Sequence, residues 1–113
     1  MIRDKSTYPD DENGDALWNM VQQGDDLSKK RDIEFTVIFS TEEDALKFGE
    51  VLLFNRQQVL LYDNEESEEY PYAIVATVAM APTHKEITDY ENLLQKYASH
   101  LNGYNDGWGC YAQ

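Results

Sequence analysis

The chain has 113 residues, one cysteine, and 22 Asp and Glu against nine Lys and Arg, which gives a formal net charge of -13. This length is typical of one domain with its own hydrophobic core, and a lone cysteine excludes an internal disulfide, as in most cytoplasmic proteins. The charge argues against direct binding of nucleic acid, and no apolar stretch approaches the ~20 residues of a membrane span. We therefore expect a single soluble, cytoplasmic domain over residues 1–113.

Residues 1–30 form an acidic lead segment with one predicted short helix. Four apolar residues in this segment recur at helical spacing: Ala16, Leu17, Met20 and Val21. Gly24 suits the C-terminal end of such a helix. The pattern predicts a helix at about 11–23, followed by a polar connection at 25–30.

The clearest strand of the chain follows this connection. Four apolar residues alternate with neighbours that are mostly polar, as in a strand with one face on a core: Ile33, Phe35, Val37 and Phe39. Ser40 and Glu43 have the spacing of a capping box, and apolar residues then recur at helical intervals. The pattern predicts a strand at 33–39 and a helix at 41–54.

The rest of the chain supplies two strands, a helix and a last strand. Its predicted parts are a strand at 59–62, an acidic solvated turn at 63–69, a strand at 72–80, a helix capped by Thr83 and Glu86, and a strand at 104–111. Two βαβ halves in this order build a four-stranded antiparallel sheet with both helices on one face. We expect an α+β, ferredoxin-like sandwich over residues 31–112, with its first and third strands at the centre.

No motif for catalysis, a cofactor or a metal fits the sequence. Calcium loops centred on Gly14 or Gly107 fail at the ligand positions. His84 and His100 fall at opposite ends of one predicted helix, about 24 Å apart at 1.5 Å per residue, so they cannot share a metal ion. We expect a protein that is not an enzyme and needs no cofactor.

Two surfaces are candidates for binding a partner. The first is acidic, with simple solvation as the alternative reading: Glu65, Glu66, Glu68, Glu69, Asp10, Asp11 and Glu12. The second is the last strand, where Tyr104, Asp106, Trp108 and Tyr111 could anchor a partner or pack within the fold. A negative field speeds encounter with basic surfaces, so the expected partner is a basic protein. An RNA-binding module of this fold would pair its aromatic residues with Arg and Lys. The charge near these aromatic residues is negative instead, which argues against RNA as the ligand.

The last strand also carries a family signature. Tyr104-Asn105-Asp106-Gly107-Trp108-Gly109 resembles the Tyr-x-Asp-Gly-Trp-Gly ending of the RraB family, bacterial regulators of ribonuclease E activity. Three other segments are similar to the same family: Asp-Asp-Glu-Asn-Gly-Asp-Ala-Leu at 10–17, Gly-Asp-Asp-Leu-Ser-Lys-Lys-Arg at 24–31, and Pro-Thr-His with Glu-Ile-Thr at 82–88. The resemblance implies a variant ferredoxin-like fold and an acidic, non-enzymatic protein. Such a protein would bind the basic, non-catalytic scaffold of ribonuclease E and lower cleavage of some transcripts.

The leading hypothesis is therefore a protein-binding regulator that resembles inhibitors of ribonuclease E and modulates RNA decay. We expect it to be a monomer or a weak homo-oligomer, without contact to nucleic acid or membrane. An alternative is an acidic immunity or mimic protein that neutralises another basic toxin or nuclease. A third hypothesis, a small enzyme of this fold, requires a pocket with convergent polar groups.

Overall fold

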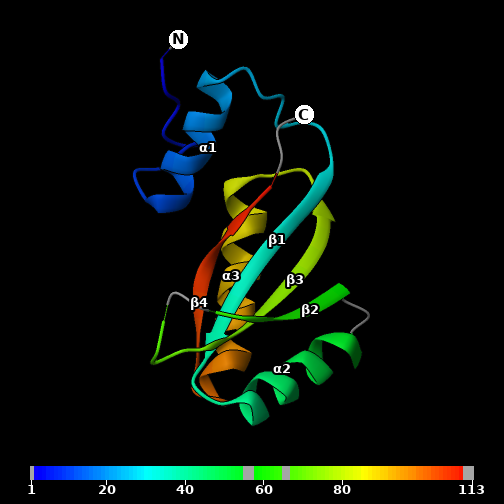
Figure 1. The fold of residues 1–113 in the computed structure, drawn as a ribbon. Coiled ribbons are helices and arrows are strands. Elements are labelled where there is room, and N and C mark those ends of the chain that lie inside the picture. The colour runs from blue at the N-terminus through cyan, green and yellow to red at the C-terminus, as the bar shows by residue number, and fades with distance from the viewer. Residues whose placement is uncertain (1, 55–57, 65–66, 111–113) are drawn as a thin grey trace.

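The structure is a computed structural model that describes residues 2–54, 58–64 and 67–110 (Figure 1). The helices are α1 (Glu12–Gln22), α2 (Glu42–Phe54) and α3 (His84–Ser99). The strands are β1 (Arg31–Phe39), β2 (Gln58–Asp63), β3 (Tyr72–Met80) and β4 (Gly103–Gly109). Periodicity in the sequence therefore predicted the type and order of these elements, with small differences at their ends.

The strands form one four-stranded sheet in the order β2-β3-β1-β4, with every neighbouring pair antiparallel. The central strands β1 and β3 pair along their whole length, from Arg31 opposite Met80 to Phe39 opposite Tyr72. These two strands also carry the strongest apolar patterns of the four in the sequence. The predicted ferredoxin-like arrangement, with β1 and β3 at the centre, is confirmed.

Both core helices cover the same face of the sheet. The odd-numbered residues of β1 are buried, and two of them contact different helices. The ring centroid of Phe39 lies 5.1 Å from that of Phe48 on α2, and Phe35 lies 4.6 Å from Tyr90 on α3. Since alternate residues of a strand point to opposite faces, α2 and α3 share one face. The opposite face, here called the open face, looks toward the viewer in Figure 1, where β1 and β4 pass in front of α3.

Side-chain caps define the starts of the helices. Asp11 accepts a hydrogen bond from the backbone N–H of Gly14 at the start of α1, and Thr83 accepts one from Glu86 at the start of α3. At α2, the Thr41 hydroxyl accepts from the backbone N–H of Asp44, so the expected cap at Ser40 is wrong by one residue. Each cap satisfies an N–H that the first helical turn leaves unbonded.

An irregularity in β4 decides which of its side chains face the helices. Trp108 lies opposite Phe35 and Asn105 lies opposite Val37, so the pairing with β1 shifts between these positions. The extra backbone is accommodated at Gly107, whose φ is +100°. This bulge turns both Asn105 and Trp108 toward the helix-covered face.

The connection between α1 and β1 is fixed by a buried ion pair. Arg31 Nη1 donates to Asp25 Oδ2 over 2.7 Å, and both side chains are only 2% exposed. Arg31 also donates to the backbone carbonyl oxygens of Asp26 and Lys29. Asp25, as a hydrogen-bonded counter-ion, raises the pKa of Arg31. The carboxylate and backbone oxygens offset the cost of burying the guanidinium.

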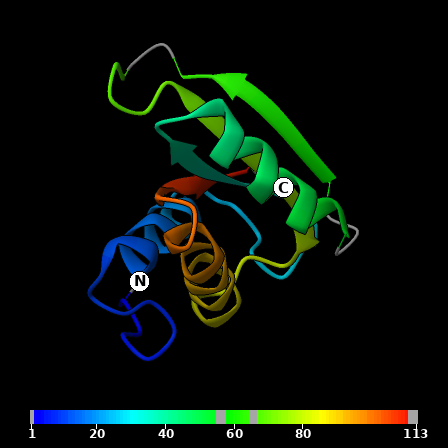
Figure 2. The same ribbon diagram turned by 90° about the horizontal axis from the view of Figure 1, so that it is seen from below.

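The lead helix packs against the rest of the fold. Leu17 on α1 is fully buried in the common core. Figure 2 shows α1 beside α3, on the opposite side of the molecule from β2. A Cβ atom at Gly14 would overlap the carbonyl oxygen of Pro9, so this close approach requires glycine. The acidic lead segment therefore contributes one wall of a cleft between α1, α3 and β4.

Candidate functional site

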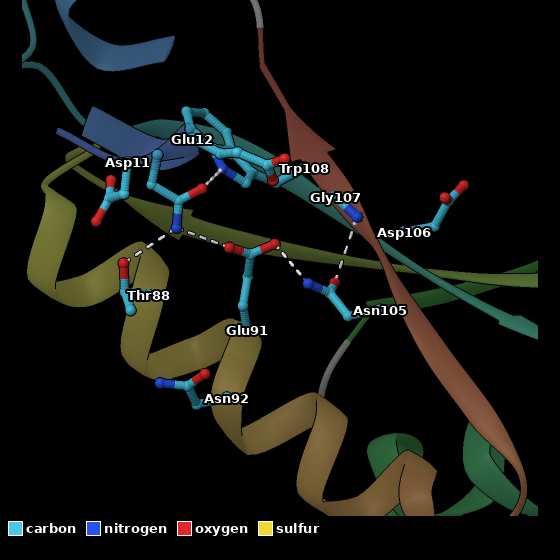
Figure 3. A pocket seen from close by; sticks show the side chains of 10 residues that line it. Asp11, Glu12, Thr88, Glu91, Asn92, Asn105, Asp106, Gly107 and Trp108 are labelled. Atoms are coloured by element: carbon cyan, nitrogen blue, oxygen red, sulfur yellow. Dashed lines mark hydrogen bonds between the residues drawn. The ribbon is translucent and has the colours of Figure 1, made fainter. Parts of the chain in front are cut away.

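A cleft of about 570 Å³ lies where α1, α3 and β4 meet (Figure 3). Its lining includes carboxylates, amides and an indole: Asp11, Glu12, Asn13, Thr88, Glu91, Asn92, Asn105, Asp106, Gly107 and Trp108. Four of these residues are acidic, and no Lys or Arg is among them. This lining favours a positively charged ligand.

A hydrogen-bond network centred on Asn13 connects the three walls of the cleft. Trp108 Nε1 on β4 donates to Asn13 Oδ1 over 2.8 Å. The amide nitrogen of Asn13 donates to Glu91 Oε1 over 2.8 Å and to Thr88 Oγ1 over 3.0 Å, and both acceptors lie on α3. One side chain from α1 thus fixes the indole of β4 relative to α3.

The network continues from Glu91 to β4. Asn105 Nδ2 donates to Glu91 Oε2 over 2.7 Å, so both oxygens of this carboxylate accept amide hydrogens. Gln95 Oε1 accepts the backbone N–H of Asn105 over 2.7 Å, and Gln95 Nε2 donates to the carbonyl oxygen of Gly103. The bulged part of β4 is therefore held to α3 by side chains. Fixed groups of this kind preorganise a surface for binding.

Asp11 occupies the edge of the cleft at the start of α1. Its carboxylate caps α1 by accepting the backbone N–H of Gly14, and it also accepts a hydrogen bond from His84 Nε2 over 2.7 Å. The backbone N–H of Gly14, followed by His84, lowers the pKa of Asp11 below its ordinary value. The side chain is therefore a stable negative charge at neutral pH.

Glu12 and Asp106 complete the acidic rim. Both residues are exposed and line the cleft, and in Figure 3 the Asp106 carboxylate points away from the network around Asn13. A carboxylate can form a bidentate contact with a guanidinium, and an indole attracts a cation over its face. The arrangement is suited to an Arg or Lys side chain from a partner.

The structure divides the predicted binding residues between two places. Asp11, Glu12, Asp106 and Trp108 meet in the cleft. Asp10 lies nearby on the surface, where Lys5 Nζ contacts its carboxylate at 2.6 Å and Arg3 at 3.8 Å.

The remaining predicted residues lie on the open face or in the connection between β2 and β3. Tyr104 pairs with Ile38 on the open face, and its ring centroid lies 5.2 Å from that of Tyr70. Glu68 and Glu69 are exposed beside Tyr70. Burial raises the pKa of Tyr70, and Glu69 raises it further. Other predicted residues lie outside the described residues: Glu65, Glu66 and Tyr111.

Sequence reasoning missed the polar residues beneath the rim. Glu91 and Gln95 have no spacing that distinguishes them from ordinary surface residues. Asn13, Thr88 and Asn105, however, lie in segments that carry the family resemblance. Three of those segments, 10–17, 82–88 and 104–109, supply residues to this one cleft. The fourth, 24–31, contains the buried pair of Asp25 and Arg31.

Three other features of the described residues were candidates for function: the thiol of Cys110, groups of possible metal ligands, and long apolar helices. Cys110 is half-buried beside Arg31, and burial raises the pKa of its thiol. Within residues 2–54, 58–64 and 67–110, no three His, Cys, Asp or Glu side chains are grouped to hold a metal ion. None of the helices in this part of the chain is both long and apolar enough to cross a bilayer.

Comparison with known proteins places the chain in a protein family. The family model described as "Regulator of ribonuclease activity B" (RraB) matches residues 10–110. No curated protein matches the chain. The matched range includes α1, the whole sheet and all three walls of the cleft.

Proposed function

Because the chain belongs to the RraB family, whose members are regulators of ribonuclease activity, we propose that it inhibits ribonuclease E by binding the basic, non-catalytic scaffold of that enzyme. The regulator contributes a binding surface and carries out no chemistry of its own. Occupation of the scaffold lowers cleavage of some transcripts and so changes RNA decay. This role assigns the protein to the cytoplasm, where it acts as one domain.

The cleft carries this proposal. Three segments that match the family, although distant in the sequence, supply neighbouring residues to its walls. Asn13, Glu91 and Trp108 hold these walls together through hydrogen bonds, while Glu12 and Asp106 remain exposed at the rim. A rigid site with exposed carboxylates is a suitable receptor for Arg or Lys side chains.

Charge also favours a basic protein over nucleic acid. The chain has a formal net charge of -13. Among the described residues, five basic side chains form ion pairs with Asp or Glu: Arg3, Lys5, Arg31, Lys47 and Lys85. A phosphate backbone requires clustered Lys and Arg, which the cleft lacks. A basic protein segment is attracted by the same field.

We assign two acidic areas to the contact. The first is the rim of the cleft, formed by Asp11, Glu12 and Asp106, with Asp10 at its border and Trp108 in its lining. The second is the connection between β2 and β3, with Tyr104 beside it: Glu65, Glu66, Glu68 and Glu69. The first area has the more defined geometry, because Trp108 belongs to a hydrogen-bonded network whose members Asn13 and Asn105 directly adjoin Glu12 and Asp106 in the sequence.

Calorimetric titration with the purified basic region of ribonuclease E from the same cell tests the proposal. At about 0.1 M salt the Debye length is about 10 Å, so exposed charges still act. The variant Glu12→Gln/Asp106→Asn should bind roughly fivefold more weakly, because exposed ion pairs each contribute about 0.2–1 kcal/mol. The variant Glu68→Gln/Glu69→Gln measures the second acidic area in the same way.

The matched control is Glu42→Gln/Glu50→Gln, which removes two exposed charges of α2 away from both areas. This control should retain nearly all the affinity of the unchanged protein. Equal weakening in all three variants would mean that net charge alone matters and that the cleft is not the contact. Absence of any binding at low salt would refute the choice of ribonuclease E as the partner.

A further inference from the structure

We propose that the open face of the sheet binds a basic amphipathic helix of a protein partner. This proposal rests on the function proposed above and adds to it the form of the partner segment and the place where its apolar side packs. None of the described helices covers the open face, since α2 and α3 contact the opposite one and α1 packs beside α3. The open face combines a row of apolar side chains, acids around that row and a sheet wide enough for one helix.

The apolar row crosses all four strands. Tyr62 on β2 pairs with Ala73 on β3, Ala73 pairs with Ile38 on β1, and Ile38 pairs with Tyr104 on β4. Residues directly opposite one another in antiparallel strands point to the same face. Tyr62 and Tyr104 are 47% and 52% exposed at the two edges, whereas Ala73 between them is 6% exposed.

A second apolar position extends this row. Leu60 is 54% exposed and pairs with Val75, two residues from the pair of Tyr62 and Ala73. Large apolar side chains that lie together on the surface are typical of interaction sites, whereas isolated ones are common everywhere. The open face therefore offers Leu60, Tyr62 and Tyr104 as anchors over a floor of small and branched residues.

Acidic residues border the row at both ends. Toward one end, Glu34 and Asp106 line a shallow pocket with Thr36, and Asp32 follows along β1. Toward the other end, Glu68 and Glu69 lie next to Tyr70, whose ring contacts Tyr104. Among the described residues of β1 to β4, the only basic one is Arg31, which is buried against Asp25. A partner with Lys and Arg around an apolar stripe has the complementary pattern.

The geometry of a sheet face favours a helix over an extended strand. Such a face presents side chains, so an added strand would leave its own backbone N–H and C=O groups without sheet partners. A helix bonds its backbone internally and can bury one apolar stripe. Four strands about 4.8 Å apart span about 15 Å, enough for one helix about 10 Å across.

Aromatic residues on a four-stranded sheet also stack RNA bases in some proteins. The acids at both ends of this row would repel the phosphates of such a ligand. A basic protein helix meets the same acids as favourable contacts. The two ligands therefore make opposite predictions, and RNA serves as a direct test.

The test compares two pairs of substitutions that are chemically the same. Leu60→Ser/Tyr104→Ser removes anchors of the open face, and Leu93→Ser/Tyr97→Ser removes exposed residues of α3 on the other side of the sheet. Two labelled probes are titrated by fluorescence anisotropy: the basic region of ribonuclease E and an 18-residue model helix of Leu and Lys. The open-face variant should bind both probes at least tenfold more weakly, since central apolar anchors dominate interface energies. The α3 variant should bind as the unchanged protein does.

Amide chemical-shift changes locate the contact independently. With either probe, they should concentrate on Leu60, Tyr62 and Tyr104. If ribonuclease E binds but the shifts fall only on Glu12, Asn92 and Trp108, the cleft suffices and the open-face proposal is wrong while the proposed function stands. If ribonuclease E fails to bind but the model helix binds at the open face, the partner is wrong and the surface is right.

Two further outcomes would overturn the proposal. Tighter binding of a single-stranded RNA than of the model helix would assign the open face to nucleic acid. Sedimentation of a dimer that the open-face substitutions dissociate would assign it to a second copy of this chain. The expected result is a monomer that does not bind RNA at physiological salt.

Discussion

At the scale of single residues, Asn13 has the largest structural role in the cleft. Its side chain accepts from Trp108 and donates to both Glu91 and Thr88, so it joins α1, β4 and α3. A short apolar side chain could make none of these bonds. The indole N–H would lose its acceptor, and one oxygen of Glu91 would lose a donor.

Replacing Asn13 should therefore destabilise the fold. We predict that Asn13→Ala lowers the free energy of unfolding by about 1–3 kcal/mol, the usual cost of leaving partly buried polar groups unpaired. The control is Asn92→Ala, an exposed asparagine of the same cleft, which should change the value by less than about 0.5 kcal/mol. Urea unfolding followed by circular dichroism measures both. Equal losses would show that the network has no special role.

Gly14 offers a second test at this scale. A Cβ atom there would overlap the carbonyl oxygen of Pro9, whereas a Cβ atom at Gly109 would meet no atom within 4 Å. We predict that Gly14→Ala costs about 1–3 kcal/mol, as overpacking does elsewhere, and that Gly109→Ala costs little. Thermal unfolding of the two variants compares them directly. A stable Gly14→Ala protein would mean that the segment before α1 can move away without cost.

At the scale of elements, the connection between α1 and β1 depends on Arg31 and Asp25. Both side chains are nearly inaccessible, in contrast to the exposed pair of Glu43 and Lys47 on α2. We predict that Asp25→Asn lowers the free energy of unfolding by about 3–5 kcal/mol, because it leaves a buried guanidinium without its counter-charge. Glu43→Gln should cost less than about 0.5 kcal/mol. Urea unfolding again separates the cases, and comparable losses would contradict this account of the connection.

The cap of α1 gives a pH dependence. Folding lowers the pKa of Asp11, mainly through the backbone N–H of Gly14, so the folded protein favours the ionised carboxylate. The resulting stabilisation is complete above the unfolded pKa of about 3.9 and is lost as the pH falls through the lower folded pKa. Asn also caps helices, so Asp11→Asn removes mainly the charge. We predict that the stability difference between the two proteins is constant near neutral pH and disappears in acid; a difference independent of pH would contradict this.

Sequence patterns predicted the elements and sheet order because apolar periodicity is local information. The alternation of Ile33, Phe35, Val37 and Phe39 fixes both the strand and its buried face. The bulge in β4 was not predictable in the same way, since it appears only when Asn105 and Trp108 are paired with β1. For the same reason, no local pattern identified Glu91 as a partner of Asn13, 78 positions away. Tyr104 and Trp108 are close in sequence, but the bulge and the pleat place them on opposite faces.

At the scale of the whole molecule, negative charge and two exposed surfaces together account for the proposed regulation. A net charge of -13 would speed the encounter with the basic partner that we propose, and the cleft and the open face are the contacts that we propose for it. We predict that raising salt from about 0.1 M to about 1 M, which shortens the Debye length from about 10 Å to about 3 Å, weakens binding to the basic region of ribonuclease E severalfold or more. Titrations at several salt concentrations measure this. Affinity that is independent of salt would contradict an electrostatic contribution.

The most direct measurement is inhibition of purified ribonuclease E with and without its basic, non-catalytic region. Cleavage of a natural transcript is followed while the regulator is added at increasing concentrations. We expect cleavage by the complete enzyme to slow as the regulator saturates it, and the enzyme lacking the basic region to cleave at an unchanged rate. Equal slowing of both enzymes, or of neither, would contradict the claim that this protein acts by binding the scaffold.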